Sequence, residues 1–164
     1  MISVGKNEVL ASVRLRRAIP EDREALARMY AEFEPKGASL GLPPRRDAES
    51  WLARLATHHN FLLWFEDRII AHAVLCADDD TAEVAVFVHQ DFRGCRLGRL
   101  LLSFLVEEAQ RLGICRVWGV TELDNVPMLR LAHSLGFVAG EDPGEFYLDL
   151  EKVEAPSKPL TTAA

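Results

Sequence analysis

The residues with the clearest chemical potential lie in one stretch, from Glu83 to Leu102. Alternating valines at 84, 86 and 88 predict a strand, and leucines spaced three and four residues apart from Leu97 onward predict a helix. A glycine-containing turn between a strand and a helix directs backbone N–H groups toward one point, where the helix dipole adds positive potential. The stretch therefore predicts an anion-binding loop made of Arg93, Gly94, Cys95, Arg96, Leu97, Gly98 and Arg99.

The spacing of the glycines excludes two common phosphate-binding loops. No Lys-Ser/Thr pair follows Gly98, as a P-loop requires, and the loop has no G-x-G-x-x-G pattern. Gly94 and Gly98 lack the Cβ that would keep the backbone away from a phosphate, whereas the side chain at Arg96 predicts ordinary backbone angles there. Arg93, Arg96 and Arg99 would add positive charge. The alternative interpretation is that these arginines are solvated surface charge.

Acidic side chains precede the same strand, at 78, 79, 80 and 83. They would attract a cation and repel a carboxylate, which predicts that an amine approaches this end. An alkylammonium has a pKa of about 10.4, so a base is useful at neutral pH. Glu83 is the candidate, because an apolar environment would raise its pKa toward neutrality. The alternative is a strand-edge carboxylate without a chemical role.

Histidines and cysteines have less to support a catalytic role. His89 shares the strand face of Glu83 but adjoins the loop, and His72 is expected to pack or to line a cleft. Neighbouring arginines would lower the pKa of the Cys95 thiol, yet the loop is expected to bind through its backbone. The three cysteines form no C-x-x-C pair, so neither a disulfide framework nor a metal site is predicted.

The composition predicts one globular domain. The chain has 164 residues, 49% of them hydrophobic and 27% charged, with a net charge of −6, which argues against general nucleic-acid binding. No apolar run approaches the roughly 18 residues of a membrane span, so no membrane partner is predicted. The first residues lack the apolar core of a signal peptide, so we expect a cytoplasmic protein. The oligomeric state is not predicted.

Periodicity and turn residues predict the elements in order. Strands are expected at 13–18, 61–65, 69–77, 83–88, 114–120, 137–138 and 146–150, and helices at 20–33, 47–55, 96–112 and 125–135. The order β-α-α-β-β-β-α-β-α-β-β predicts an α/β (α+β) fold, a mixed sheet with helices on both faces. Residues 13–150 form the domain, between a flexible N-terminus (1–12) and a tail (151–164). The Gly/Pro loop 33–44 is either a wall beside the substrate or a connector between helices.

Two motifs resemble those of the GNAT superfamily of N-acetyltransferases. The loop from Arg93 to Gly98 is similar to [QR]-x-x-G-x-[GA], with Arg96 in place of a glycine. The segment N-x-x-M-x-x-L-A-x-x-x-G-F, from Asn125 to Phe137, is similar to the family's N-x-x-A-x-x-L-Y-x-x-x-G-F. The order of elements also matches, so the resemblance covers residues 13–150. With Met128 and Ala132, it looks most like the GNAT domain of bacterial protein lysine acetyltransferases.

The resemblance implies acetyl-CoA as co-substrate, with its pyrophosphate on the loop. Pantetheine would lie between the fourth and fifth strands, against the backbone of Val86, Phe87 and Val88. Asn125 and Met128 would contact the pantetheine side, although Asn125 is equally expected as a plain helix cap. Because Ala132 replaces the family's tyrosine, no general acid is identified.

The resemblance further implies a primary amine as acceptor and favours a protein lysine. Loop 33–44 argues the other way, because a closed lid would enclose a small amine such as a polyamine or an amino-sugar. A non-catalytic acyl-CoA-binding sensor remains an alternative, as does a different acyl donor such as succinyl- or propionyl-CoA.

Overall fold

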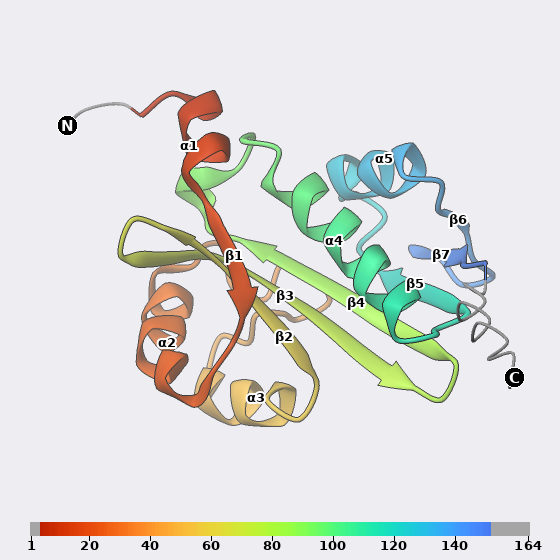
Figure 1. Cartoon of the computed structure of the whole chain (residues 1–164), viewed down its shortest axis with the longest axis horizontal. Coiled ribbons are helices and arrows are strands. Elements are labelled where there is room, and N and C mark those ends of the chain that lie inside the picture. Colours follow the sequence, from red (N-terminus) through yellow and green to blue (C-terminus); the bar gives the residue numbers. More distant parts are fainter. Residues whose placement is uncertain (1–3, 152–164) are drawn as a thin grey trace, which may run out of the picture.

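A computed structural model of the protein describes residues 4–151 (Figure 1). Its centre is a seven-stranded sheet in the order β1-β2-β3-β4-β5-β7-β6. The strands are β1 (Arg14–Arg17), β2 (His59–Phe65), β3 (Arg68–Asp78), β4 (Thr81–Val88), β5 (Arg116–Val120), β6 (Val138–Ala139) and β7 (Glu145–Asp149). Among the strands of residues 4–151, only β4 and β5 pair in parallel, which confirms the predicted mixed sheet and its one parallel pair.

Helices cover both faces of the sheet. They are α1 (Lys6–Ser12), α2 (Arg23–Glu32), α3 (Ala48–Leu55), α4 (Leu97–Arg111) and α5 (Val126–Ser134), with 3-10 turns η1 (Pro20–Asp22) and η2 (Gln90–Phe92). Local sequence explains their ends: the Asp47 carboxylate accepts the Ser50 N–H at 3.2 Å at the start of α3, and α4 is followed by Gly113 at φ +76°. From β1 onward the order is the predicted one.

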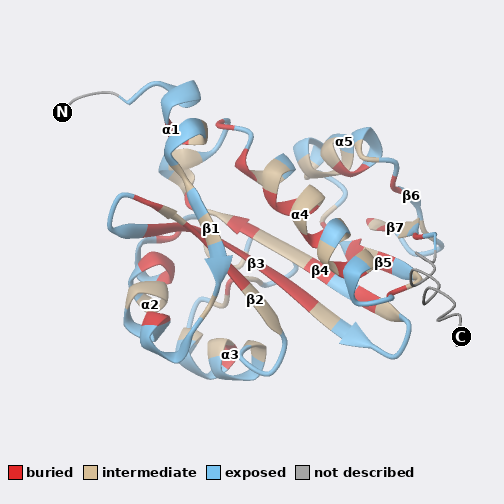
Figure 2. Ribbon diagram, viewed as in Figure 1, coloured by how far each residue is buried: buried red, intermediate tan, exposed pale blue. Residues whose placement is uncertain are grey.

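Two hydrophobic cores lie on opposite faces of the sheet (Figure 2). Residues of α1, α4 and α5 form one core with Val84, and α2 and α3 form the other, which is rich in aromatic rings, with Phe87. Because side chains alternate along a strand, β4 contributes to both. Its predicted two faces are confirmed, and the strand is held between two layers of helices.

The N-terminal segment differs from the prediction. Residues 6–12, within the segment expected to be flexible, form α1, and Val9 of this helix is only 3% exposed in the core. Seven residues are too short for a helical period to be recognised. Apart from Glu151, the predicted C-terminal tail lies outside the described residues. Within the described part of the chain, no helix is long and apolar enough to cross a membrane.

Candidate active site

The ladder between β4 and β5 is short. It pairs Thr81 with Arg116, Ala82 with Val117, and Glu83 with Trp118. Beyond Glu83, β4 continues through Val88 toward the start of α4, without further partners on β5 (Figure 1). We call the end of the ladder, at Glu83 and Trp118, the β4–β5 fork. It leaves one edge of β4 open to another extended chain.

The hydrogen bonds of β4 show which backbone groups face that edge. The His89 N–H donates to the Ile70 carbonyl of β3 at 2.9 Å, so Phe87, two residues earlier, also directs its backbone toward β3. Val86 and Val88 therefore direct theirs toward the side of β5. The Val88 carbonyl there accepts the Arg93 Nε–H at 3.0 Å. Of the three predicted strand residues, Val86 and Val88 can offer backbone partners at the open edge of β4. The backbone of Phe87 instead faces β3, and its side chain lies in the aromatic core beside α2 and α3.

The loop before α4 makes a sharp turn with two residues at positive φ. Gly94 has φ +76°, and Arg96, the N-cap of α4, has φ 64° and ψ 18°. The expectation of ordinary backbone angles at Arg96 is therefore wrong. The turn into α4 keeps the left-handed conformation that a glycine would adopt freely, at a cost of roughly 1 kcal/mol for another residue. The Cys95 and Leu97 side chains are buried, so the loop presents its backbone outward.

Gly98 is the second residue of α4 and serves helix packing as well as the loop. A Cβ at this position would lie 3.3 Å from Leu131 Cδ2 of α5. Such a distance is tighter than most real contacts of a Cβ atom. The absent side chain therefore lets α4 and α5 approach each other, which sequence analysis did not predict.

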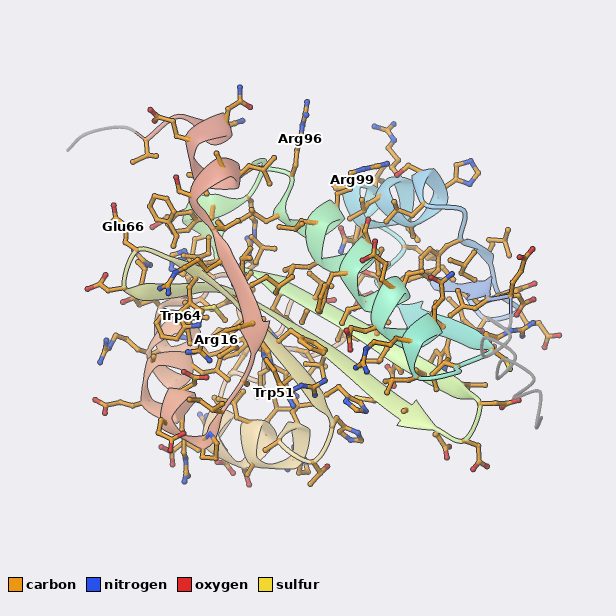
Figure 3. All side chains as sticks on the ribbon, in the orientation of Figure 1. Arg16, Trp51, Trp64, Glu66, Arg96 and Arg99 are labelled. Atoms are coloured by element: carbon orange, nitrogen blue, oxygen red, sulfur yellow. The ribbon has the colours of Figure 1, made fainter. Side chains whose placement is uncertain are left out.

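The three arginines near the loop lie in different surroundings. Arg93 lies over the Phe33 ring at 5.1 Å, and partial burial lowers the pKa of its guanidinium. Arg99 donates to Ser134 Oγ of α5 at 3.0 Å, and Arg96 extends outward from the loop (Figure 3). Lys6 of α1, which sequence analysis missed, also reaches the loop, with Nζ 3.3 Å from the position of a Cβ on Gly94. The sequence carries no signal for this contact, because α1 is too short for its period to be recognised.

Glu83 lies at the fork, opposite Cys76 in the β3 ladder and Trp118 in the β5 ladder. Partial desolvation raises the pKa of its carboxyl, and the nearby His58 opposes this shift. Burial and the Glu83 charge raise the pKa of the Cys76 thiol to about 11. At neutral pH the thiol is therefore protonated, and Glu83 stays the candidate for the base at the fork.

His72 is a buried structural histidine rather than a base. Its Nδ1 lies 2.8 Å from the Tyr30 hydroxyl, and its Nε2 lies 2.7 Å from Asn60 Oδ1. The Asn60 amide nitrogen donates to the Leu55 carbonyl at 2.6 Å, so Oδ1 is the acceptor and His72 Nε2 carries the proton. Complete burial lowers the pKa of His72 to about 3. The expectation that His72 packs is confirmed.

Both polar atoms of the Asn125 side chain form hydrogen bonds with nearby residues. Its oxygen accepts the Met128 N–H at 3.3 Å, and its nitrogen donates to Thr121 Oγ1 at 2.9 Å. The helix-cap interpretation is thereby confirmed. Met128 is partly buried against the core on the α4 side, and Ala132 is 1% exposed.

Loop 33–44 contacts both η2, which precedes the anion loop, and the segment that follows β5. Its Glu34 N–H donates to the Gln90 side chain in η2 at 2.9 Å, and its Leu40 N–H donates to the Glu122 carboxylate, after β5, at 3.2 Å. These two hydrogen bonds tie the loop to the segments that follow β4 and β5.

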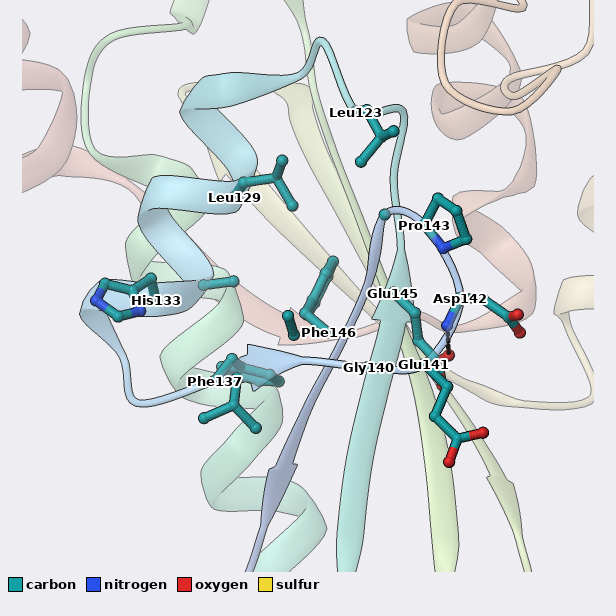
Figure 4. A pocket seen from close by; sticks show the side chains of 14 residues that line it. Leu123, Leu129, His133, Phe137, Gly140, Glu141, Asp142, Pro143, Glu145 and Phe146 are labelled. Carbon is teal, nitrogen blue, oxygen red and sulfur yellow. Dashed lines mark hydrogen bonds between the residues drawn. The ribbon is translucent and has the colours of Figure 1, made fainter.

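A pocket of about 460 Å³ lies elsewhere, between α5 and the β6–β7 hairpin (Figure 4). Mostly apolar side chains line it, among them Leu123, Leu129 and Phe146. Neither Glu83 nor the anion loop contributes to it. Across residues 4–151, no three His, Cys, Asp or Glu side chains gather in a way that could hold a metal ion.

Comparisons with known proteins agree with this arrangement. A family model described as "Acetyltransferase (GNAT) family" matches residues 23–137. The L-methionine sulfoximine/L-methionine sulfone acetyltransferase of Salmonella typhimurium is 32% identical over 111 residues, which are 55% of this chain and 65% of that protein. The L-amino acid N-acyltransferase MnaT of Escherichia coli is 32% identical over 112 residues, 56% of this chain and 65% of its own. The chain thus spans less than two thirds of these relatives.

Solved structures confirm the predicted fold. The yncA protein of Salmonella typhimurium, solved with its cofactor acetyl-CoA, has a TM-score of 0.69 and 26% identity, covering 88% of this chain and 98% of that one. The GNAT domain of S. lividans PAT has a TM-score of 0.73 and 20% identity, covering 84% and 90%. At that identity the second likeness concerns the fold alone.

Proposed function

The chain belongs to the acetyltransferase (GNAT) family, and from this premise we propose that it transfers an acetyl group from acetyl-CoA to a primary amine. One observation carries the proposal: the anion loop and Glu83 lie at opposite ends of the open edge of β4. The five residue steps from 83 to 88 span about 17 Å. An extended pantetheine arm would lie along this edge, with its phosphates at the loop and its thioester at the fork.

The residues of this chain would then have separate roles in binding and in proton transfer. The backbone of loop 93–98 holds the phosphates, and Val86 and Val88 pair with the pantetheine amides. At the fork, Glu83 accepts the proton from the acceptor ammonium. The amine nitrogen then attacks the thioester carbon, so that a C–N bond forms, the C–S bond breaks and CoA leaves as a thiolate. The thiolate takes up the second proton, which the nitrogen releases as the amide forms. A β4 N–H directed at the open edge near the fork, such as that of Val86, would stabilise the oxyanion.

We propose a small amine as the acceptor, with free α-amino acids as the first class to test. Loop 33–44 supports this choice, because its contacts at Gln90 and Glu122 hold it across the opening between the end of β4 and the end of β5. A fixed wall restricts the entry of a folded protein. The names of the Salmonella typhimurium and Escherichia coli relatives point to the same class.

A protein lysine is the second candidate. It is supported by the sequence resemblance around Asn125 and Met128 to the protein lysine enzymes. The acidic residues beside Glu83 suit the ammonium group of either acceptor, and they would repel the carboxylate of a free amino acid, which favours the lysine. This candidate requires that loop 33–44 open far enough to admit a lysine on a loop of the substrate.

Measuring release of the CoA thiol tests both candidates. The purified protein would be incubated with acetyl-CoA and with free L-amino acids, methionine sulfone, polyamines or lysine-containing peptides. We expect turnover with amino acids and little with peptides. Turnover with peptides alone would favour the protein lysine. Tight acetyl-CoA binding without turnover on any amine would contradict catalysis and favour the sensor alternative.

A further inference from the structure

We propose that Lys6 of α1 binds a phosphate group of acetyl-CoA, which makes α1 part of the cofactor site; this inference rests on the proposed function. The Lys6 ammonium lies against the backbone of the anion loop, 3.3 Å from the position that a Cβ on Gly94 would take. Gly94 is the first glycine of that loop and adopts φ +76°. Figure 1 shows α1 beside the segment that leads into α4.

The packing of α1 fixes this lysine at the loop. Val9, three residues further along the helix, is 3% exposed and belongs to the core on the α4 side, and Leu10 and Val13 pack against the same core. At the start of the helix, the Gly5 N–H donates to the Glu8 carboxylate at 2.8 Å. Lys6 is therefore the first residue of a docked helix, and its exposed ammonium lies beside Gly94 of the anion loop.

Apart from Arg96, the loop has few other cations to offer. Arg93 is turned away, with its Nε–H on the Val88 carbonyl and its guanidinium over Phe33, and Arg99 is bonded to Ser134. Within residues 4–151, Lys6 makes no ion pair and no side-chain hydrogen bond. A compact ammonium without a carboxylate partner, beside backbone N–H groups, suits a phosphate oxygen.

Calorimetric titration with acetyl-CoA tests the assignment. Lys6→Ala should raise Kd about three- to tenfold at low salt, and the difference should shrink as salt screens the charge. Lys6→Arg should retain most of the affinity, because it restores the charge. Arg28→Ala is the matched control: it removes an exposed cation from α2, on the other face of the sheet, and should leave Kd unchanged.

Dephospho-CoA, which lacks the 3′-phosphate, identifies the group that is bound. If Lys6 binds the 3′-phosphate, Lys6→Ala should weaken CoA and leave dephospho-CoA unaffected; if it binds the pyrophosphate, both should weaken equally. Equal Kd values for wild type and a folded Lys6→Ala variant, with both ligands, would overturn the inference and leave the proposed function standing. A wild-type protein that does not bind acetyl-CoA would overturn the proposed function itself.

Discussion

Glu83 combines a position at the end of the β4–β5 ladder with a carboxyl whose pKa is raised by desolvation. A base at this place would act on the amine and not on CoA. Glu83→Gln should therefore lower kcat by about 10²- to 10⁴-fold and leave the Kd for acetyl-CoA nearly unchanged. Steady-state kinetics and calorimetry on the same preparations measure the two effects. Asp80→Asn, a charge change in the preceding turn, should leave kcat within about twofold.

The pH dependence gives a second measure of the same residue. Because the Glu83 pKa is raised above the ordinary value of 4.5, the basic form is lost as pH falls through that raised value. The acid limb of kcat/KM should thus lie above pH 4.5 in the wild type. In Glu83→Gln the limb should follow the acceptor amine alone, so the deficit should shrink at high pH. A deficit that stays constant across pH would assign the proton to another group.

Arg96 adopts a left-handed backbone at a position where the related motif has glycine. Arg96→Gly and Arg96→Ala both remove the guanidinium, but only glycine removes the backbone strain. We expect both variants to weaken acetyl-CoA binding to the same modest degree, and the glycine variant to be more stable than the alanine variant by about 1 kcal/mol. Urea denaturation measures the difference. Equal stabilities would show that this turn carries no strain.

At the scale of elements, the Tyr30–His72–Asn60 chain joins α2, β3 and the start of β2. The His72 pKa is about 3 in the folded protein against 6.5 ordinarily. Between these values the unfolded chain binds more protons, so stability rises with pH. The wild type should lose about 2–3 kcal/mol from this residue between about pH 6.5 and 4.5.

His72→Gln cannot take up this proton, so its unfolding free energy should fall less steeply over the same range. The other titrating groups are common to both proteins and cancel in the comparison. Denaturant unfolding at several pH values measures both slopes. Parallel curves would mean that His72 is protonated in the folded state or that the acid loss arises elsewhere.

The wall formed by loop 33–44 depends on the Glu122 carboxylate, which accepts the Leu40 N–H. Glu122→Ala should loosen the loop over the fork and raise the KM for a small acceptor by about three- to tenfold, since a hydrogen bond to a charged group is lost. The Kd for acetyl-CoA should not change, because the anion loop is untouched. Asp124→Asn, an exposed change two residues away, is the control. An unchanged acceptor KM in Glu122→Ala would remove this loop from the site.

The order of elements and the two faces of β4 follow from patterns that the sequence displays openly, namely alternation in strands and spacings of three and four in helices. What sequence reasoning missed depends on contacts between distant segments. Nothing near Lys6 indicates that α1 docks beside Gly94, and nothing near Gly98 indicates Leu131 of α5. The Arg93 side chain also turns to Phe33, 60 positions earlier in the chain. Motif spacing located the loop but could not orient its side chains.

At the scale of the whole molecule, one sheet separates two cores, and the site lies where the sheet opens between them. The core on the α4 side includes α1, so the N-terminal segment belongs to the folded unit that carries the anion loop. The aromatic core on the other side includes Phe33, where loop 33–44 begins, and Phe87 of β4. In the function that we propose, each core would support one substrate, and β4 would connect them.

Val9 tests whether α1 is part of this unit. Its side chain is 3% exposed among core residues, so Val9→Ala should lower the unfolding free energy by about 1–3 kcal/mol through lost burial and a cavity. Asn7→Ala, on the exposed side of the same helix, should change it by less than about 0.5 kcal/mol. Because Val9 also holds Lys6 at the loop, Val9→Ala should weaken acetyl-CoA binding, and by no more than Lys6→Ala does. Urea denaturation and calorimetry measure the two quantities. A Val9→Ala protein as stable as the wild type would mean that α1 does not pack on the core in solution, and the position of Lys6 would then have no support.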